Sequence, residues 1–372
     1  MTMQELPIVD ASAYFSAHLR GQDTSAEALA LGRDIKEACH AVGMFYLVGY
    51  DIDQLLIDSL MVQTAAFFAC SQSDKEAISI KNSPQFRGYG MLKNYRDWRE
   101  QIHIGVESNL PALASNEINE SLEANLYWQL WGKNQWPSTS DGNQFKGVVL
   151  DYFAAIESLA RTVLTLLAQS LDKPANFFTE RMKDRPYLLM KAMSYLPQQT
   201  SATGNSASGT SASGTSASGN SALRVAQMGV TAHCDWSWLT FLIQDDVGGL
   251  EAQDINGRWR KVNPLANSLV VNTGELLEIE TGGYLRASPH RVINERIDRQ
   301  RFSVPVFINP ALDASILPAV NSSSLAICQS KEHVHKVIRP GRALDSFVFG
   351  DSEFERKAKG IWCYDSECVS AL

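Results

Sequence analysis

The sequence predicts an α+β protein whose helices come first and brace a mainly β core. In the first half of the chain, apolar residues recur at helical spacing, whereas after about residue 185 short β-type runs alternate with turn residues. The number and spacing of these runs are typical of a double-sheet jelly roll, also called a distorted double-stranded β-helix. With 45% apolar and 20% charged residues, the 372-residue chain has the composition of a globular protein rather than a disordered one.

The individual elements follow from local pattern. We expect helices over residues 26–42, 53–70 and 144–169, where apolar residues return every three or four positions. Gly43 stands where a C-cap would end the first of these helices. We expect strands over residues 6–10, 44–48, 187–195, 239–244, 268–272 and 301–308, which are short apolar runs bounded by turn residues.

A low-complexity segment, residues 201–222, interrupts the β region. It contains only Ser, Ala, Thr, Gly and Asn in a five-residue near-repeat, a composition that cannot build a core. We therefore expect a flexible, dispensable insertion rather than a linker between domains. The whole chain, residues 1–372, is then one catalytic unit, with an N-terminal region (1–120), a jelly-roll core (185–310) and a C-terminal extension (311–372).

Charge and cysteine content limit the functional class. The net charge of −8 argues against binding to nucleic acid, which needs clustered Lys and Arg. The beginning of the sequence has no secretory pattern, and no uncharged apolar run approaches the roughly 18 residues of a membrane span. The six cysteines are dispersed without CxxC spacing, which is typical of reduced thiols in the cytoplasm. We expect a cytoplasmic protein with a small-molecule substrate and no nucleic acid, membrane or protein partner.

The sharpest local signal is the pair His233 and Asp235. If residues 231–235 form a strand, these two side chains face the same side. His290 is the natural third ligand, and two His with one carboxylate form the non-haem Fe(II) triad. His-x-Asp alone is a weak signal, and the residues that follow it in the sequence, His290, Arg301 and Ser303, strengthen it. A second pair, His333 and His335, is interpreted as an exposed polar strand end rather than a metal site.

Arg301 and Ser303 follow His290 closely and again share a strand face. A guanidinium group beside a hydroxyl suits one carboxylate of a dicarboxylate. This is the arrangement that a 2-oxoglutarate co-substrate needs, with its keto-acid end on the metal and its distal carboxylate on Arg and Ser.

An ordered set of motifs extends from residue 6 to about residue 310. They include LPIVD (6–10), ACHAVGMFYLVGYDID (38–53), FRGYG (86–90), DWRE (97–100), MKAMSYLP (190–197), LTFLIQDDVGGLE (239–251), TGGYLRASPHRV (281–292) and RFSVPVF (301–307). Together with HCD (233–235), they resemble the isopenicillin N synthase-like branch of the Fe(II)/2-oxoglutarate-dependent dioxygenases.

The resemblance implies roles for particular residues. It makes His233, Asp235 and His290 the iron ligands, which are also the catalytic residues. It makes Arg301 and Ser303 the residues that bind the distal carboxylate of 2-oxoglutarate. The remaining roles are less specific. Tyr195 matches a Tyr that often helps to hold the co-substrate, although a role as a core aromatic is an equal alternative. Arg87 matches a position that contacts a substrate carboxylate in some members, although a structural role is favoured.

Several positions depart from the family pattern. Met193 replaces the usual Asn, and the common Asn-x-Gly-Asp turn is Asn272-Thr273-Gly274-Glu275, to which we assign a structural role. For the tryptophans, Trp236, Trp238 and Trp259, packing against the sheet is favoured over lining a substrate pocket.

The implied activity uses Fe(II), 2-oxoglutarate and O₂, and yields succinate and CO₂ with hydroxylation, desaturation or cyclisation of a small metabolite, as in secondary metabolism. Asp235 argues against halogenation, which needs the carboxylate's coordination position for a halide. Two alternatives stay open: an Fe(II) oxidase of the same fold that uses no 2-oxoglutarate, and a non-catalytic barrel that only binds a ligand.

Overall fold

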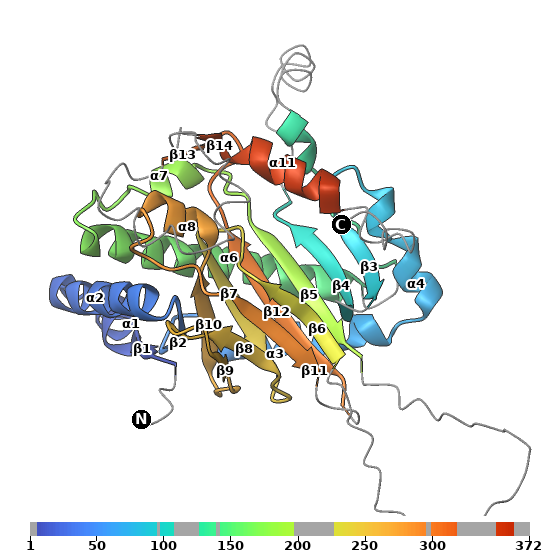
Figure 1. Ribbon diagram of the computed structural model, residues 1–372, viewed down its shortest axis with the longest axis horizontal. Coiled ribbons are helices and arrows are strands. Elements are labelled where there is room, and N and C mark those ends of the chain that lie inside the picture. Colours follow the sequence, from blue (N-terminus) through green and yellow to red (C-terminus); the bar gives the residue numbers. More distant parts are fainter. Residues whose placement is uncertain are drawn as a thin grey trace, which may run out of the picture.

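Most strands of the described residues belong to two facing sheets. The computed structural model describes residues 6–94, 97–107, 126–138, 142–196, 227–294, 299–317 and 347–360. The large sheet has the order β1 (Ile8–Asp10), β2 (Met44–Val48), β10 (Ser268–Thr273), β7 (Leu239–Gln244), β12 (Arg301–Ile308), β5 (Leu189–Tyr195), β4 (Trp98–Gly105), β3 (Gly88–Lys93). The smaller sheet has the order β6 (Gln227–His233), β11 (His290–Asn294), β8 (Leu250–Gln253), β9 (Trp259–Lys261). A short pair, β13 (Ser315–Ile316) and β14 (Phe347–Val348), lies apart (Figure 1).

Helices precede most of these strands in the chain, as expected. They are α1 (Ser12–Leu19), α2 (Ser25–Ala41), α3 (Gln54–Ala69), α4 (Gln72–Ala77), α6 (Gly142–Ser170), α7 (Thr179–Met182), α8 (Glu275–Glu280) and α11 (Phe349–Gly360), with the 3₁₀ turns η1 (Ile80–Asn82) and η2 (Leu126–Leu130). The long helix α6 packs against α2 and α3. No helix among the described residues is both long and apolar enough to cross a membrane.

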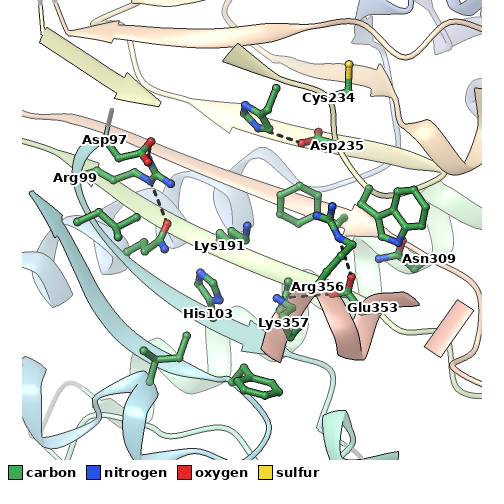
Figure 2. A pocket seen from close by; sticks show the side chains of 18 residues that line it. Asp97, Arg99, His103, Lys191, Cys234, Asp235, Asn309, Glu353, Arg356 and Lys357 are labelled. Atoms are coloured by element: carbon green, nitrogen blue, oxygen red, sulfur yellow. Dashed lines mark hydrogen bonds and ion pairs between the residues drawn. The ribbon is translucent and has the colours of Figure 1, made fainter. Parts of the chain in front are cut away.

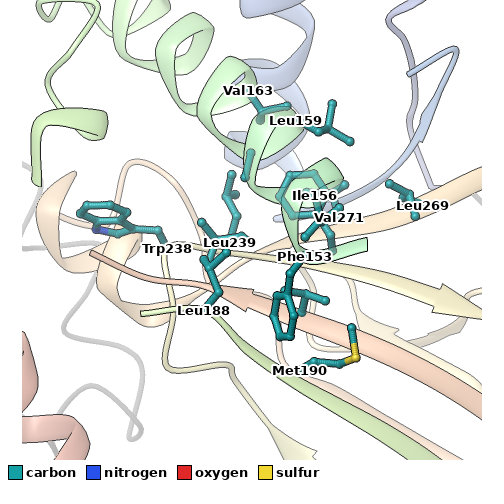
Figure 3. Close-up of a cluster of buried hydrophobic side chains, with 14 of the residues drawn as sticks. Phe153, Ile156, Leu159, Val163, Leu188, Met190, Trp238, Leu239, Leu269 and Val271 are labelled. Carbon is teal, nitrogen blue, oxygen red and sulfur yellow. The ribbon is translucent and has the colours of Figure 1, made fainter. Parts of the chain in front are cut away.

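The main core lies between α6 and the outer face of the large sheet. Figure 3 shows Phe153, Ile156 and Leu159 of α6 projecting toward the strand residues Met190 and Val271. The spacing of three residues between each of these helical positions keeps them on one face. The prediction that residues 144–169 form a core-facing helix is confirmed.

The inner face of the large sheet is different in character. Along β5, Met190 and Ala192 point into the helix-covered core, while Lys191, Met193 and Tyr195 line a cavity on the other side. Successive side chains of a strand face opposite ways, so one strand serves both the core and the cavity. The same alternation along β12 and β7 gives the cavity its wall.

The elements that the sequence predicts lie within two residues of their expected bounds. The helices predicted over 26–42 and 53–70 are α2 and α3, and the strands predicted over 44–48 and 301–308 are β2 and β12. Gly43 ends α2 as expected: its φ is 76°, and its amide donates to the carbonyl of Ala38 at 3.0 Å.

One strand ends earlier than the sequence suggests, and two other expectations concern residues outside the described ranges. The strand expected over residues 231–235 ends at His233, so Asp235 follows the strand instead of continuing it. The reason is that the chain turns after His233, where the amide of Glu275 bonds to the Asp235 carbonyl at 2.8 Å. The low-complexity segment 201–222 and the pair His333 and His335 lie outside the described residues.

Candidate active site

His233, Asp235 and His290 converge at the end of the smaller sheet. His233 and His290 are cross-strand partners of β6 and β11, and their ring centroids are 4.4 Å apart. Asp235 Oδ1 lies 3.5 Å from Nε2 of His233 and 3.6 Å from Nε2 of His290. All three ligand atoms lie within 4.8 Å of one another, so a single ion can reach them. The turn after β6, rather than strand alternation, brings Asp235 to the two imidazoles.

Each imidazole is oriented through its other nitrogen. Nδ1 of His233 lies 2.8 Å from the carbonyl of Thr231, and Nδ1 of His290 lies 3.0 Å from the carbonyl of Ser288. A carbonyl only accepts, so the proton resides on Nδ1 and the lone pair of Nε2 is directed toward Asp235. Burial lowers the pKa of His290, which favours the neutral ring that metals bind.

Hydrogen bonds also fix the orientation of the Asp235 carboxylate. Its Oδ2 accepts hydrogen bonds from Thr240 Oγ1 at 2.7 Å and from Asn272 Nδ2 at 2.9 Å, which leaves Oδ1 facing the histidines. Burial alone raises the pKa of the Asp235 carboxyl, but His290 and His233 in their protonated forms, together with the Asn272 amide, outweigh burial and hold the pKa below its usual range. The group is therefore ionised, as a metal ligand must be.

A second set of side chains lines the same cavity farther along the sheet. Arg301 and Ser303 of β12 lie beside Tyr195 of β5, and Arg301 and Tyr195 are register partners. The Ser303 hydroxyl donates to the Tyr195 hydroxyl at 3.3 Å, and the Arg301 guanidinium lies 4.6 Å from the centre of the Tyr195 ring. Nη2 of Arg301 donates to Gln244 Oε1 at 3.1 Å.

Two nitrogens of Arg301 have no such partner. The residue is 2% exposed, yet its Nε and Nη1 have no hydrogen-bond partner among the residues that the structure describes. A buried cation with unsatisfied donors is costly unless an anion completes it. A carboxylate is the usual partner of a guanidinium that has free donors.

Comparisons with known proteins agree with this geometry. Residues 6–139 match the family model described as non-haem dioxygenase in morphine synthesis N-terminal, and residues 218–310 match the 2OG-Fe(II) oxygenase superfamily. A probable iron/ascorbate oxidoreductase of Dictyostelium discoideum is 30% identical over 323 residues, covering 83% of this chain and 82% of that protein. The 2-oxoglutarate-Fe(II) type oxidoreductase hxnY of Emericella nidulans is 29% identical over 326 residues, covering 84% and 82%.

The chain belongs to the Fe(II)/2-oxoglutarate-dependent oxygenase family. It is an oxidoreductase that uses Fe(II), 2-oxoglutarate and O₂. The fold also agrees: a crystal structure of a Neurospora crassa protein in complex with alpha-KG and thymine has a TM-score of 0.70, with 20% identity and coverage of 95% of this chain and 96% of that one. The alternative of a non-catalytic barrel is set aside by these relatives.

The residues of this oxygenase fit both groups. Two neutral imidazoles and an ionised carboxylate on one side of a cavity are the donor set for non-haem Fe(II). The unsatisfied donors of Arg301 fit the distal carboxylate of 2-oxoglutarate. Both observations come from side chains that line one continuous cavity.

Arg87 lies elsewhere. It is 1% exposed and precedes β3, and its guanidinium donates to the carbonyls of Gly132 at 2.6 Å and Leu130 at 3.2 Å, and to Asn134 Oδ1 at 3.2 Å. These bonds fasten the segment 126–138 to the sheet. The arrangement agrees with the structural alternative, and Arg87 lines neither of the two cavities beside the histidines.

Sequence reasoning missed several residues of the oxygenase's site. Asn272 and Thr240, which fix Asp235, are register partners of β10 and β7. The family's Asn-x-Gly-Asp turn could have pointed to Asn272, whereas nothing in the sequence marked Thr240. Trp236 and Trp238 are both buried in the core as expected, and Trp236 also lines a second cavity, where the guanidinium of Arg356 lies 5.3 Å from its ring centre.

This second cavity, drawn in Figure 2, is lined by His233 and Asp235 but not by His290 or Arg301. It has a volume of about 300 Å³ and is lined from β4, β5, β12 and α11. Arg99, Gln101, Lys191, His233, Asp235 and Phe307 line both cavities. His233 and Asp235 thus lie between the cavity that holds Arg301 and a more open, more polar one.

Proposed function

We propose that this oxygenase binds Fe(II) through His233, Asp235 and His290 and oxidises a small-molecule substrate held in the cavity that reaches α11. Arg301, Ser303 and Tyr195 bind 2-oxoglutarate on the opposite side of the triad. The observation that carries the proposal is the pair of buried, unsatisfied nitrogens of Arg301, in the same cavity as the three ligands. A buried guanidinium left incomplete is explained when a carboxylate is its normal partner.

The protein's own contribution is binding, orientation and exclusion of water. Bound Fe(II) and 2-oxoglutarate together supply O₂ activation, with succinate and CO₂ as products beside the oxidised substrate. Thr240 and Asn272 hold the Asp235 carboxylate in one orientation, and the Thr231 and Ser288 carbonyls do the same for the imidazoles. The apolar lining of the co-substrate cavity keeps bulk water away from the reacting groups. It is formed by Met44, Met193, Val230, Leu242, Leu250 and Val292.

The outcome for the substrate is hydroxylation, desaturation or cyclisation. Asp235 keeps its place beside the histidines, so no coordination position is vacated for a halide, and halogenation is not proposed. The Neurospora crassa protein of similar fold was crystallised with thymine, a small molecule. A cavity of about 300 Å³ likewise suits a small metabolite.

The competing activity is an Fe(II) oxidase that consumes no 2-oxoglutarate. The decisive experiment gives the purified protein Fe(II) and O₂, with and without 2-oxoglutarate, and measures O₂ uptake and succinate together against a panel of small metabolites. We expect succinate to form in step with substrate loss. O₂ uptake that is unchanged when 2-oxoglutarate is omitted would overturn the assignment of Arg301, Ser303 and Tyr195.

We also propose that the enzyme acts in the cytoplasm, with no nucleic acid, membrane or protein partner. The net charge of −8 and the dispersed cysteines support this. Cell fractionation of the full chain would test it, since recovery with a membrane fraction or in a larger complex would contradict the proposal.

A further inference from the structure

The cavity that reaches α11 is lined by an excess of cationic side chains. Leaving aside the histidines and the candidate metal ligand Asp235, the lining contains four cationic side chains and two carboxylates (Figure 2). The cations are Arg99, Lys191, Arg356 and Lys357, and the carboxylates are Asp97 and Glu353. A cavity of one dominant charge attracts ligands of the opposite charge.

Both carboxylates are already engaged. Asp97 Oδ1 lies 2.6 Å from Nη1 of Arg99, and Glu353 lies 3.6 Å from Arg356 and 3.7 Å from Lys357. Each of these pairs joins residues at most four positions apart in the chain, so the pairs do not extend across the cavity. They leave the remaining cation, Lys191, without a carboxylate within 4.0 Å among the described residues.

Lys191 occupies a central position. It lies in the middle of β5 on the cavity face, between Leu189 and Met193, and lines both the co-substrate cavity and the second cavity. Its Nζ lies 5.0 Å from the ring centre of Phe307, a cation–π contact that does not neutralise the charge.

The surroundings make a bare ammonium group costly here. Burial lowers the pKa of Lys191 to about 7, and the positive charges of Lys357 and Arg99 act in the same direction. Asp235 opposes them only in part. An anionic ligand would raise this pKa and hold the amine in its charged form, so a lysine without a carboxylate partner in such a place is explained when a ligand supplies the anion.

We infer that the substrate is a small carboxylate-bearing molecule whose carboxylate binds Lys191, with Arg356 and Lys357 of α11 on the opposite wall. The inference rests on the proposed function, because it assumes that 2-oxoglutarate occupies the Arg301 side of the triad. The carboxylate fixes one end of the substrate, and the rest of the molecule extends past the histidines, where oxidation takes place. Charge-assisted hydrogen bonds of this kind are strong and directional.

The test compares isosteric anionic and neutral probes. The full-length protein is loaded with Fe(II) and 2-oxoglutarate without O₂, after a titration has measured its 2-oxoglutarate affinity. Calorimetry then measures the binding of propionate, benzoate and phenylacetate against their primary carboxamides. We expect at least one carboxylate to bind about tenfold or more tightly than its amide, a difference typical of one charge-assisted hydrogen bond. Equal binding, or no detectable binding of any carboxylate, would overturn the inference.

Variants assign the preference to Lys191. Lys191→Met, of similar length but uncharged, is expected to lose the preference for carboxylates, whereas Lys191→Arg retains it. Lys173→Met, an exposed lysine after α6, is the matched control and is expected to bind like the wild type. Melting temperatures verify that each variant is folded.

The 2-oxoglutarate titration separates the two hypotheses. The inference requires that Lys191→Met bind 2-oxoglutarate as tightly as the wild type does. If its affinity falls, Lys191 serves the co-substrate, and the substrate assignment is wrong. If the wild type itself fails to bind 2-oxoglutarate, the proposed function fails instead.

Discussion

The two cavities beside the histidines are built in different ways. In the co-substrate cavity, Arg301, Ser303 and Tyr195 come from two neighbouring strands, and their positions follow from strand register. In the second cavity, β4, β5 and β12 are again adjacent strands of the large sheet, but α11 contributes side chains from outside that sheet. The comparison teaches that one sheet supports both cavities, and that α11 contributes to the second cavity only.

The largest expected effect is on the triad, of which His233 and Asp235 line both cavities and His290 lines the cavity of Arg301. His290→Ala removes an imidazole whose Nε2 lies 3.6 Å from Asp235 Oδ1. Loss of even an outer-shell partner of a metal costs about 10–100-fold, so loss of a ligand should lower Fe(II) affinity and succinate formation by more than about 100-fold. Both are measured directly, with His18→Ala, an exposed histidine of α1, as control. Normal Fe(II) binding by His290→Ala would remove this histidine from the site.

The next largest effect is expected on 2-oxoglutarate binding alone, in the cavity that holds Arg301. Arg301→Met removes the unsatisfied buried guanidinium and should weaken 2-oxoglutarate binding by at least about 30-fold, or about 2 kcal/mol, because one partner of a buried charge pair is lost. Fe(II) affinity should stay unchanged. The matched control is Arg33→Met, since the Arg33 side chain is 62% exposed. A normal 2-oxoglutarate titration of Arg301→Met would place the co-substrate elsewhere.

A smaller effect is expected at the support of Asp235. Asn272→Ala removes the 2.9 Å bond to Asp235 Oδ2, while Thr240 keeps its own bond to the same oxygen. We expect Fe(II) affinity to fall about 10–100-fold, as for other outer-shell partners, with the 2-oxoglutarate affinity of the remaining holoenzyme little changed. Asn176→Ala, at an exposed position, is the control. An unchanged Fe(II) affinity would show that Thr240 alone orients the carboxylate.

The smallest effect is a pH dependence of stability from the second cavity. The pKa of Lys191 is about 7 in the folded protein and near the ordinary lysine value of 10.5 when unfolded, so the unfolded chain binds more protons between these values. Stability therefore rises as the pH increases from about 7 to about 10.5. The charged groups around Lys191 are Lys357 and Arg356 of α11, Arg99 of β4 and Asp235.

Lys191→Met should remove this rise and increase the melting temperature of the ligand-free protein at pH 7. Thermal unfolding of both proteins across that pH range measures the difference, with Lys173→Met as control. A variant that melts lower than the wild type at pH 7 would mean that the ammonium stabilises the cavity, contrary to its lack of a carboxylate partner.

Local pattern was sufficient for the longer helices, for several core strands and for the candidate site residues. The apolar spacing of residues 144–169 predicts α6 because a helix repeats every 3.6 residues and one face must be buried. The motif residues His233, Asp235 and His290 are recognisable because few residue combinations bind Fe(II). Arg301 and Ser303 share a face because strand side chains alternate.

Local pattern failed where the chain turns or where distant elements meet. Asp235 lies beyond the end of β6, and the bond that sets this turn comes from Glu275, 40 residues away. Thr240 became a support of Asp235 through the register of β7 with β10, and Trp236 met Arg356 through the docking of α11. These are long-range contacts, and no short window of sequence contains both partners.

The sequence by itself therefore predicted the α+β jelly-roll class, three candidate metal ligands and a candidate carboxylate-binding pair, because the class depends on residue type and short repeats, and the candidate residues lie in an ordered set of family motifs. The tertiary structure decided that Arg87 fastens the segment 126–138, that Thr240 and Asn272 fix Asp235, and that Lys191 stands without a carboxylate partner among the described residues beside α11. The physical reason is that hydrogen-bond satisfaction and charge pairing are properties of a side chain's complete surroundings, which folding alone assembles.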